Sequence, residues 1–461
     1  MNWWVVTKVA GVDSVAQQTD VWRSRDSTIV EITEDSLTVK PCDDRINVDT
    51  CGSRQVEVKP FIANLSTNLS HCFWLDDRRI MKQLTLLLML ILFTFVVPIG
   101  AQEKTASKIR ELDPEMAERK RADDGLSWYD VARWGVEGRI LSETERKRWF
   151  DRLPGAADGK VTKAVWNLSR HSAGMMVRFK TDATAIHVHY KLLNANLAMP
   201  HMPATGVSGV DLYARDDEGK WRWVQVTRPS SQEVMAQLVS DLAPGFREYA
   251  IYLPLYNGVE FLAIGVPPKS KFEAREPRQK PIVFYGTSIT HGACASRPGM
   301  VHTAILGRRF DMPVVNLGFS GNGKMHTEVG DYLTQIDAAA YVIDCLPNMN
   351  AEMVEERCVP LVKQIRAKKP DTPIILVEDR RNTNSWILPA RDAHHTANHA
   401  ALKDAFDKLQ SESVGNLYYI QGDRLYGIDG DGATDGSHAN DLGFFRQANI
   451  FEPVLRKALG L

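Results

Sequence analysis

Cysteine is scarce in this chain of 461 residues, which contains only six. No two of them form a Cys-x-x-Cys pair, so the sequence offers no framework for a zinc or thiol-redox site. An excess of one charge is also lacking, because 56 basic residues balance 57 acidic ones and the formal net charge is −1. Such a chain is not built to coat nucleic acid or an anionic membrane. No internal repeat is evident, and a globular protein of two or three domains is expected.

The cysteines fall into two groups of three. Cys294, Cys345 and Cys358 lie in the C-terminal part of the chain, and the others lie before residue 73. Three cysteines cannot all pair with one another, so the C-terminal ones are predicted to be buried thiols with at most one disulfide.

One long apolar run, residues 84–97, departs from this ordinary composition. Met81 and Lys82 precede it and Pro98-Ile99-Gly100-Ala101 follow it. A basic start, an apolar core and a small-residue exit predict a signal peptide at residues 81–101, with cleavage after Ala101. The protein is therefore expected to be secreted or periplasmic.

The position of this signal leaves two interpretations open. Met81 is the physiological start and residues 1–80 are a non-physiological or disordered extension, or residues 81–101 are retained as an internal signal anchor. The apolar core is shorter than the roughly 20 residues of a spanning helix, which favours the first interpretation.

Residues 125–268 carry short segments in which apolar and polar residues alternate, separated by turn signals such as Asp216-Asp217-Glu218-Gly219. This pattern is typical of half-buried antiparallel strands. Strands are predicted at 165–168, 174–179, 185–190, 221–226, 247–253 and 258–266. Many short strands with little helix predict a β-sandwich of jelly-roll type. A leader segment at 102–124 precedes this domain, and a polar linker at 269–280 follows it.

Strands and helices alternate in residues 281–461. The predicted strands are 281–285, 313–316, 340–344, 373–377 and 417–420, and helices are expected near 299–310, 326–335, 351–368, 391–411 and 441–459. This alternation predicts an α/β domain in which a parallel sheet lies between two helical layers, a three-layer αβα arrangement. Side chains that follow the carboxyl ends of such strands meet at one edge of the sheet.

A candidate nucleophile directly follows the first of these strands, in Gly286-Thr287-Ser288-Ile289-Thr290. A serine hydroxyl is a poor nucleophile at neutral pH unless an imidazole accepts its proton and a third group orients that imidazole. Asp435-Gly436-Ser437-His438 supplies both, because Asp435 lies within one turn of chain of His438. Ser288, His438 and Asp435 are therefore the predicted catalytic residues.

Attack on an ester also creates an oxyanion, which requires fixed N–H donors. Gly321 follows the strand that ends at Asn316, and Asn348 follows the strand 340–344. The backbone N–H groups of Gly321 and Ser288 and the side-chain amide of Asn348 are the predicted donors.

Serine, glycine, asparagine and histidine in this order, the first three just past a strand, resemble the SGNH (GDSL-type) hydrolases. The resemblance covers about residues 280–461, and four motif blocks in order make it specific. The first block departs from Gly-Asp-Ser-Leu at Thr287 and Ile289, and Leu346-Pro347-Asn348-Met349 replaces the usual Gly-x-Asn-Asp. The resemblance implies an acyl-enzyme mechanism that uses these residues and needs neither metal nor cofactor.

Gly209-Val210-Asp211-Leu212-Tyr213 resembles the Gly-x-Asp-Leu-Tyr segment of sandwich domains that precede some SGNH hydrolases. The two-domain arrangement is similar to that of the acetyl-removing carbohydrate esterases of the second family. These resemblances imply a secreted serine esterase that removes short acyl groups, O-acetyl above all, from carbohydrate. The expected partner is a small-molecule or polysaccharide ester, without nucleic acid, and with a membrane only if residues 81–101 are retained.

Alternatives remain at the level of the whole protein. A lysophospholipase or a general short-chain esterase would use the same groups. A non-catalytic carbohydrate-binding protein and a membrane-tethered scaffold are the alternatives outside enzymology.

Other residues have both a functional and a structural interpretation. Rivals of His438 as the base are His291, His302, His326, His394, His395 and His399. Asp344 is expected to make structural hydrogen bonds, and Trp221 and Trp223 to lie in the sandwich core rather than form a sugar platform. Arg297 and Trp386 shape the pocket or serve packing. The acidic run 429–436 lacks the spacing and glutamate of an EF-hand calcium loop.

Overall fold

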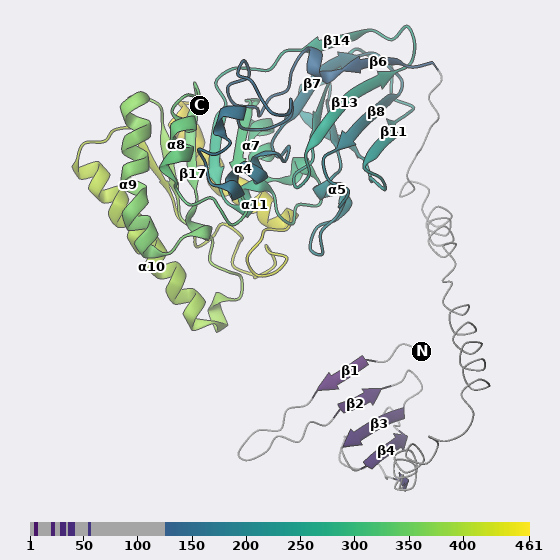
Figure 1. Cartoon of the computed structure of the whole chain (residues 1–461), viewed down its shortest axis with the longest axis vertical. Coiled ribbons are helices and arrows are strands. Elements are labelled where there is room, and N and C mark those ends of the chain that lie inside the picture. Colours follow the sequence, from purple (N-terminus) through teal and green to yellow (C-terminus); the bar gives the residue numbers. More distant parts are fainter. Residues whose placement is uncertain (1–3, 8–19, 24–27, 34–35, 42–53, 57–124) are drawn as a thin grey trace, which may run out of the picture. The chain divides into compact units, whose positions relative to one another are not determined.

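The computed structural model describes residues 4–7, 20–23, 28–33, 36–41, 54–56 and 125–461, and the chain divides into two units, residues 1–108 and 109–461 (Figure 1). In the first unit, five antiparallel strands pair in chain order, a sheet that the sequence did not predict: β1 (Trp4–Thr7), β2 (Asp20–Arg23), β3 (Thr28–Thr33), β4 (Ser36–Pro41) and β5 (Arg54–Val56). The predicted signal peptide at 81–101 and leader at 102–124 lie outside the described residues.

The second unit begins with two antiparallel sheets, which confirms the predicted sandwich. One sheet has the order β10-β9-β12-β7-β14 and the other the order β11-β8-β13-β6. Their facing side chains, among them Phe179, Tyr190 and Leu212, form one buried core. The strands are β6 (Ser127–Asp130), β7 (Met176–Thr181), β8 (Ile186–Leu192), β9 (Asp211–Arg215), β10 (Trp221–Val226), β11 (Glu233–Val239), β12 (Arg247–Tyr252), β13 (Val259–Val266) and β14 (Phe272–Arg275).

Two predictions about this region need correction. The strand predicted at 165–168 is wrong, because these residues belong to helix α4 (Lys163–Ser169), which Thr162 caps through the N–H of Val165. Strand β14 lies within the predicted linker, because Phe272 stacks on Tyr129 at a ring distance of 3.9 Å and draws the segment onto β7.

The tryptophans of β10 are also not core residues. Trp223 is 48% exposed and Trp221 is half-buried, because β10 is an edge strand of its sheet. The Trp221 ring packs against the guanidinium of Arg215, and that of Trp223 against Arg297.

Residues 282–461 form the predicted α/β domain. Five parallel strands have the order β16-β15-β17-β18-β19: β15 (Ile282–Gly286), β16 (Val314–Gly318), β17 (Ala340–Asp344), β18 (Ile374–Val377) and β19 (Leu417–Ile420). The main helices are α7 (His302–Phe310), α8 (Thr327–Leu333), α9 (Ala351–Lys368), α10 (Pro389–Ser411) and α11 (Asp441–Leu459). Figure 1 shows α8, α9 and α10 together, whereas α7 contacts α11.

Alternate residues of each strand enter different cores, as the twofold period of a strand requires. Val283 and Tyr285 of β15 pack with residues of α9 and α10. Ile282 and Phe284 pack with residues of α7 and α11. Helices therefore cover both faces of the sheet, and a functional site is expected at the edge where the strands end.

The strand order reverses beside β15, because the chain goes from β15 to β16 on one side and then to β17 on the other. Ligands of open α/β sheets bind at such a switch point, outside the carboxyl ends of the strands. Ser288, Gly321 and Asn348 follow these three strands, so the fold gathers them at this position.

The Gly-x-Asp-Leu-Tyr segment joins the sandwich to the α/β domain. Asp211 is fully buried and accepts hydrogen bonds from Arg297 at 2.9 Å and from the N–H of Gly299 at 2.8 Å. Burial raises the pKa of Asp211, although Arg297 acts in the opposite direction. Arg297 therefore serves the contact between the domains.

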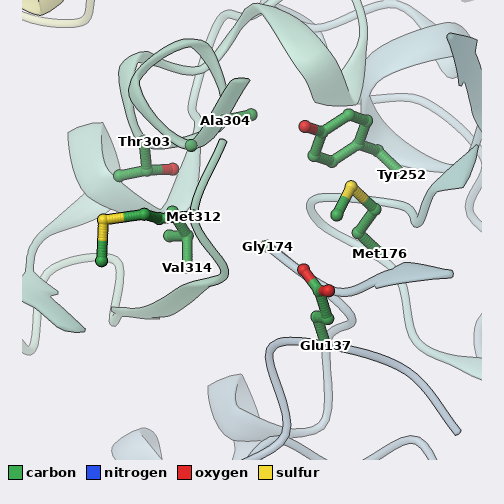
Figure 2. A pocket seen from close by; sticks show the side chains of 9 residues that line it. Glu137, Gly174, Met176, Tyr252, Thr303, Ala304, Met312 and Val314 are labelled. Carbon is green, nitrogen blue, oxygen red and sulfur yellow. The ribbon is translucent and has the colours of Figure 1, made fainter. Parts of the chain in front are cut away.

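A small cavity marks another part of this contact (Figure 2). Met176 and Tyr252 line it from the sandwich, and Thr303 and Val314 line it from the α/β domain. Its volume of about 20 Å³ holds about one water molecule, so it is no substrate site.

Cys294, Cys345 and Cys358 are free and buried, which confirms their prediction as thiols. Among the described residues, no helix has the length and hydropathy needed to cross a membrane.

Candidate active site

Ser288 begins a one-turn helix, α6 (Ser288–His291), directly after β15. The Thr287 hydroxyl caps this helix by accepting from the N–H of Ile289 at 3.3 Å. Only glycine fits at Gly286, since a Cβ there would lie 2.1 Å from the hydroxyl of Thr290. The sharp turn from strand to helix places the Ser288 side chain, which is 7% exposed, at the edge of the sheet.

The structure brings the three predicted catalytic side chains into one hydrogen-bonded chain. Ser288 Oγ lies 2.9 Å from His438 Nε2, although the two residues are 150 positions apart. His438 Nδ1 lies 2.7 Å from Asp435 Oδ2. A carboxylate only accepts, so Nδ1 carries the proton and Nε2 is free to accept from Ser288.

Asp435 is suited to orient this ring. Its Oδ1 accepts from the backbone N–H groups of Ser437 at 2.9 Å and His438 at 2.8 Å. Partial burial acts to raise the pKa of Asp435, but these bonds and the bond from the His438 ring outweigh it and lower the pKa to about 2. The carboxylate therefore stays ionised at any pH where the neighbouring imidazole can act as a base.

The loop of His438 is held from the end of β18. Arg380 donates through Nε to the carbonyl of Ser437 at 2.9 Å and also contacts the Ser437 hydroxyl. The N–H of Thr383 donates to the carbonyl of Gly436 at 2.9 Å. Three bonds from one segment thus fix the two residues that precede His438.

The predicted oxyanion donors follow the carboxyl ends of three neighbouring strands, β15, β16 and β17. Gly321 has a φ of +69°, a left-handed conformation that glycine adopts freely, and its N–H has no acceptor among the described residues. Gly323 brings this loop against the end of β15, since a Cβ at Gly323 would lie 2.0 Å from the carbonyl oxygen of Gly286. Two free backbone donors, those of Ser288 and Gly321, therefore come from segments in direct contact.

Asn348 ends the short helix η5 (Leu346–Asn348) that follows β17. Its amide oxygen is buried without a hydrogen-bond partner among the described residues, and no described residue bonds its amide nitrogen. The neighbouring carbonyl of Met349 accepts from Asn398 at 2.9 Å, which ties this turn to α10. The side-chain amide is thus uncommitted at the strand end where the sequence predicts an oxyanion donor.

The rival histidines have other surroundings, and among the described residues only His438 is bonded to the Ser288 hydroxyl. His291 is buried and donates through Nε2 to the carbonyl of Leu255 at 2.7 Å, and burial lowers its pKa well below the usual value. Burial lowers the pKa of His302 to about 3. His326 lies at the start of α8, and His394, His395 and His399 lie on α10.

The sandwich domain contributes a residue that the sequence did not single out. Tyr256 follows β12 and donates through its hydroxyl to the carbonyl of Ser288 at 3.3 Å. Its ring stacks on His291, with the centroids 4.2 Å apart. Tyr256 therefore packs against the helix that presents the nucleophile.

A second such residue is Arg152, which is fully buried. Its guanidinium donates to four backbone carbonyls, at 2.6–3.0 Å: those of Leu168, His171, Asn316 and Gly318. Burial lowers its pKa to about 9. Because bonds to carbonyls require no particular partner side chain, no sequence motif could reveal either Arg152 or Tyr256.

An open cavity of about 300 Å³ lies beside the segment that holds the His438 loop. Arg380 and Thr383, which bond that loop, are among its lining residues. Asp392 and Asp423 add carboxylates, and Trp386, 82% exposed, adds an aromatic surface. Trp386 thus lies at a pocket and not in a packed core.

Two family models match the chain. The model of the GDSL-like lipase/acylhydrolase family matches residues 279–456, and the model for the N-terminus of SGNH-hydrolase-type esterases, named for Gly-x-Asp-Leu-Tyr, matches residues 126–272. A search of curated proteins found no match.

Solved structures are similar to about three quarters of the chain. A protein from Bacteroides ovatus described as a GDSL-like lipase is 33% identical, with a TM-score of 0.69, over 73% of this chain and 98% of its own. A salicylyl-acyltransferase from a tetracycline biosynthetic pathway is 18% identical, with a TM-score of 0.59, over 74% and 99%. A family two carbohydrate esterase from Cellvibrio japonicus is 11% identical, with a TM-score of 0.49, over 73% and 98%.

Proposed function

Since this chain belongs to the GDSL-like lipase and acylhydrolase family and is a serine hydrolase of ester bonds, we propose that it removes short acyl groups, above all O-acetyl groups, from carbohydrates. The observation that carries the proposed chemistry is the chain of hydrogen bonds from Ser288 through His438 to Asp435, at 2.9 and 2.7 Å. It offers a hydroxyl, a base and an orienting carboxylate in one place.

In the proposed reaction, Ser288 Oγ attacks the ester carbonyl while His438 Nε2 takes its proton. Asp435 holds the ring and stabilises the imidazolium that forms. The N–H groups of Ser288 and Gly321 and the amide of Asn348 bind the oxyanion. His438 then gives its proton to the departing alcohol, and a water molecule hydrolyses the acyl-enzyme by the same steps.

The surroundings of the site support a polar alcohol as the leaving group. The cavity beside the His438 loop combines carboxylates, guanidinium groups and the exposed ring of Trp386. Convergent polar groups with an apolar surface are the usual composition of a small-molecule site. A sugar presents hydroxyl groups that bond to the polar side chains and C–H faces that pack on the aromatic ring.

Hydrolysis of p-nitrophenyl acetate and release of acetate from acetylated xylan, mannan, pectin and sialic acids test this proposal. We expect Ser288→Ala to lower kcat by about 10³-fold or more, because the nucleophile is lost and only binding groups remain. Ser411→Ala, at the exposed end of α10, is the control and should keep wild-type activity. Equal inactivity of wild type and Ser288→Ala, with glycan binding retained, would favour a binding protein instead, and preference for long acyl chains would favour a lysophospholipase.

We also propose that the enzyme acts outside the cytoplasm, on the basis of the signal-peptide pattern at residues 81–101. N-terminal sequencing of protein recovered from the medium or periplasm should then begin at Gln102. A protein that retains residues 81–101 would contradict cleavage and support the anchored form.

A further inference from the structure

The catalytic imidazole has a second histidine beside it, and this one comes from the sandwich domain. The ring centroids of His201 and His438 are 6.2 Å apart, with the ring planes inclined by 32°. His201 is exposed, and its ring has no hydrogen-bond partner among the described residues. No step of the proposed reaction uses this side chain.

The backbone around His201 is held in a tight hairpin. The N–H of Met199 donates to the carbonyl of Met202, and the N–H of Met202 donates back to Met199, both at 3.0 Å. Pro200, whose ring fixes φ, is the other residue of the tip. Met202 is buried in the same apolar core as Ile289 of the nucleophile helix. The hairpin is thus anchored in the apolar core that also holds the helix of Ser288.

The residues that follow the hairpin add further anchors. In α5 (Ala204–Val207), the Thr205 hydroxyl donates to the carbonyl of Ser296 at 2.6 Å. Gly206 allows the two segments to meet, since a Cβ there would lie 2.3 Å from the carbonyl oxygen of Ala295. The position of His201 therefore follows from packed and bonded neighbours on the α/β domain.

We propose that His201 binds the alcohol half of the ester and selects substrates with a free hydroxyl near the acylated oxygen; this inference rests on the proposed esterase function. The departing alcohol must reach His438 Nε2 to receive its proton, so its substituents lie beside that ring. A neutral imidazole offers one donor and one acceptor nitrogen, which suit a sugar hydroxyl. A phenol without further hydroxyls, as in p-nitrophenyl acetate, makes no such bond.

Steady-state kinetics on two substrates test this inference. In His201→Ala, kcat/KM for a partially acetylated xylo-oligosaccharide should fall about tenfold, mainly through KM, because one hydrogen bond to the substrate is lost. The same constant for p-nitrophenyl acetate should change less than twofold. His201→Gln, which keeps a donor and an acceptor, should recover part of the activity on the sugar ester. His189→Ala, on β8 of the same domain, is the matched control and should change neither constant.

The outcomes separate the two proposals. Unchanged values of kcat/KM on both substrates in His201→Ala would overturn the role of His201. An equal fall on both substrates would also overturn it, because it would place the effect of His201 on the base. A wild-type enzyme that hydrolyses p-nitrophenyl acetate but no acetylated sugar would contradict the proposed carbohydrate substrate, and the inference about His201 would fail with it.

Discussion

At the scale of single residues, Asp344 is a carboxyl group in a buried environment that disfavours its charge. It ends β17, is 2% exposed, and accepts a hydrogen bond from Thr290 at 3.0 Å, a structural role that the sequence predicts. Burial raises its pKa from 3.8 to about 7, although Thr290 and Arg380 act to lower it. The folded protein therefore binds a proton at the Asp344 carboxyl group more tightly than the unfolded chain does. The stability that Asp344 contributes is complete below about pH 4 and is lost as the pH rises through about 7.

Asp344→Asn should remove this pH dependence. Asparagine keeps an acceptor for Thr290 and cannot ionise, so the variant should gain stability over the wild type at pH 8 but little at pH 5. The gain in the free energy of unfolding, variant over wild type, should be larger at pH 8 than at pH 5 by roughly 1–4 kcal/mol. Urea unfolding of both proteins at the two pH values measures this gain, and an equal gain at pH 5 and pH 8 would refute the prediction.

At the scale of elements, the loop between β16 and α8 depends on a close backbone approach. Gly323 faces the carbonyl of Gly286 so closely that a Cβ would lie 2.0 Å from that oxygen. Gly323→Ala should therefore push the loop that carries Gly321 away from Ser288 and lower kcat for p-nitrophenyl acetate by roughly 100–1,000-fold, the typical loss when one oxyanion donor is removed. Gly415→Ala, where a Cβ meets nothing within 4 Å, is the control. Wild-type kcat in Gly323→Ala would show that this contact does not position the donor.

Elements with strong local signals could be predicted from the sequence. Helices α9 and α11 have the predicted bounds, since Asn350 and Asn440 cap them and the apolar pattern continues to their ends. The one-turn helix α6 was missed because four residues carry no periodic pattern. The error at 165–168 has the same origin, because a short apolar segment fits a strand and a helix equally well.

At the scale of the whole molecule, the contact between the sandwich and the α/β domain includes the pair of the buried Asp211 and Arg297. Asp211→Asn would leave a largely buried guanidinium without its charged partner. We expect this to lower the free energy of unfolding by about 3 kcal/mol. Asp216→Asn, which removes the charged partner of the exposed Arg222 in the turn after β9, should have little effect. Chemical denaturation measures the loss in the free energy of unfolding of each variant. Equal losses would show that the buried pair of Asp211 stabilises the protein no more than the pair of Asp216 does.

The contact between Ser288 and His438 could be predicted at this scale, but the contribution of the sandwich to the candidate site could not. Ser288, Gly321 and Asn348 follow parallel strands whose carboxyl ends lie at one edge of the sheet, a placement that follows from the hydrophobic pattern. Tyr256 and Arg152 act through backbone carbonyls, and every residue has one. His201 reaches the site through a hairpin whose docking depends on the packed tertiary structure.

The separation of 150 residues between Ser288 and His438 has a consequence for biosynthesis. The ribosome makes Ser288 long before it makes His438. A nascent polypeptide that has been made only as far as the α/β sheet thus contains the proposed nucleophile without its proposed base, and we expect hydrolysis only after residue 438 has been made and has folded against Ser288.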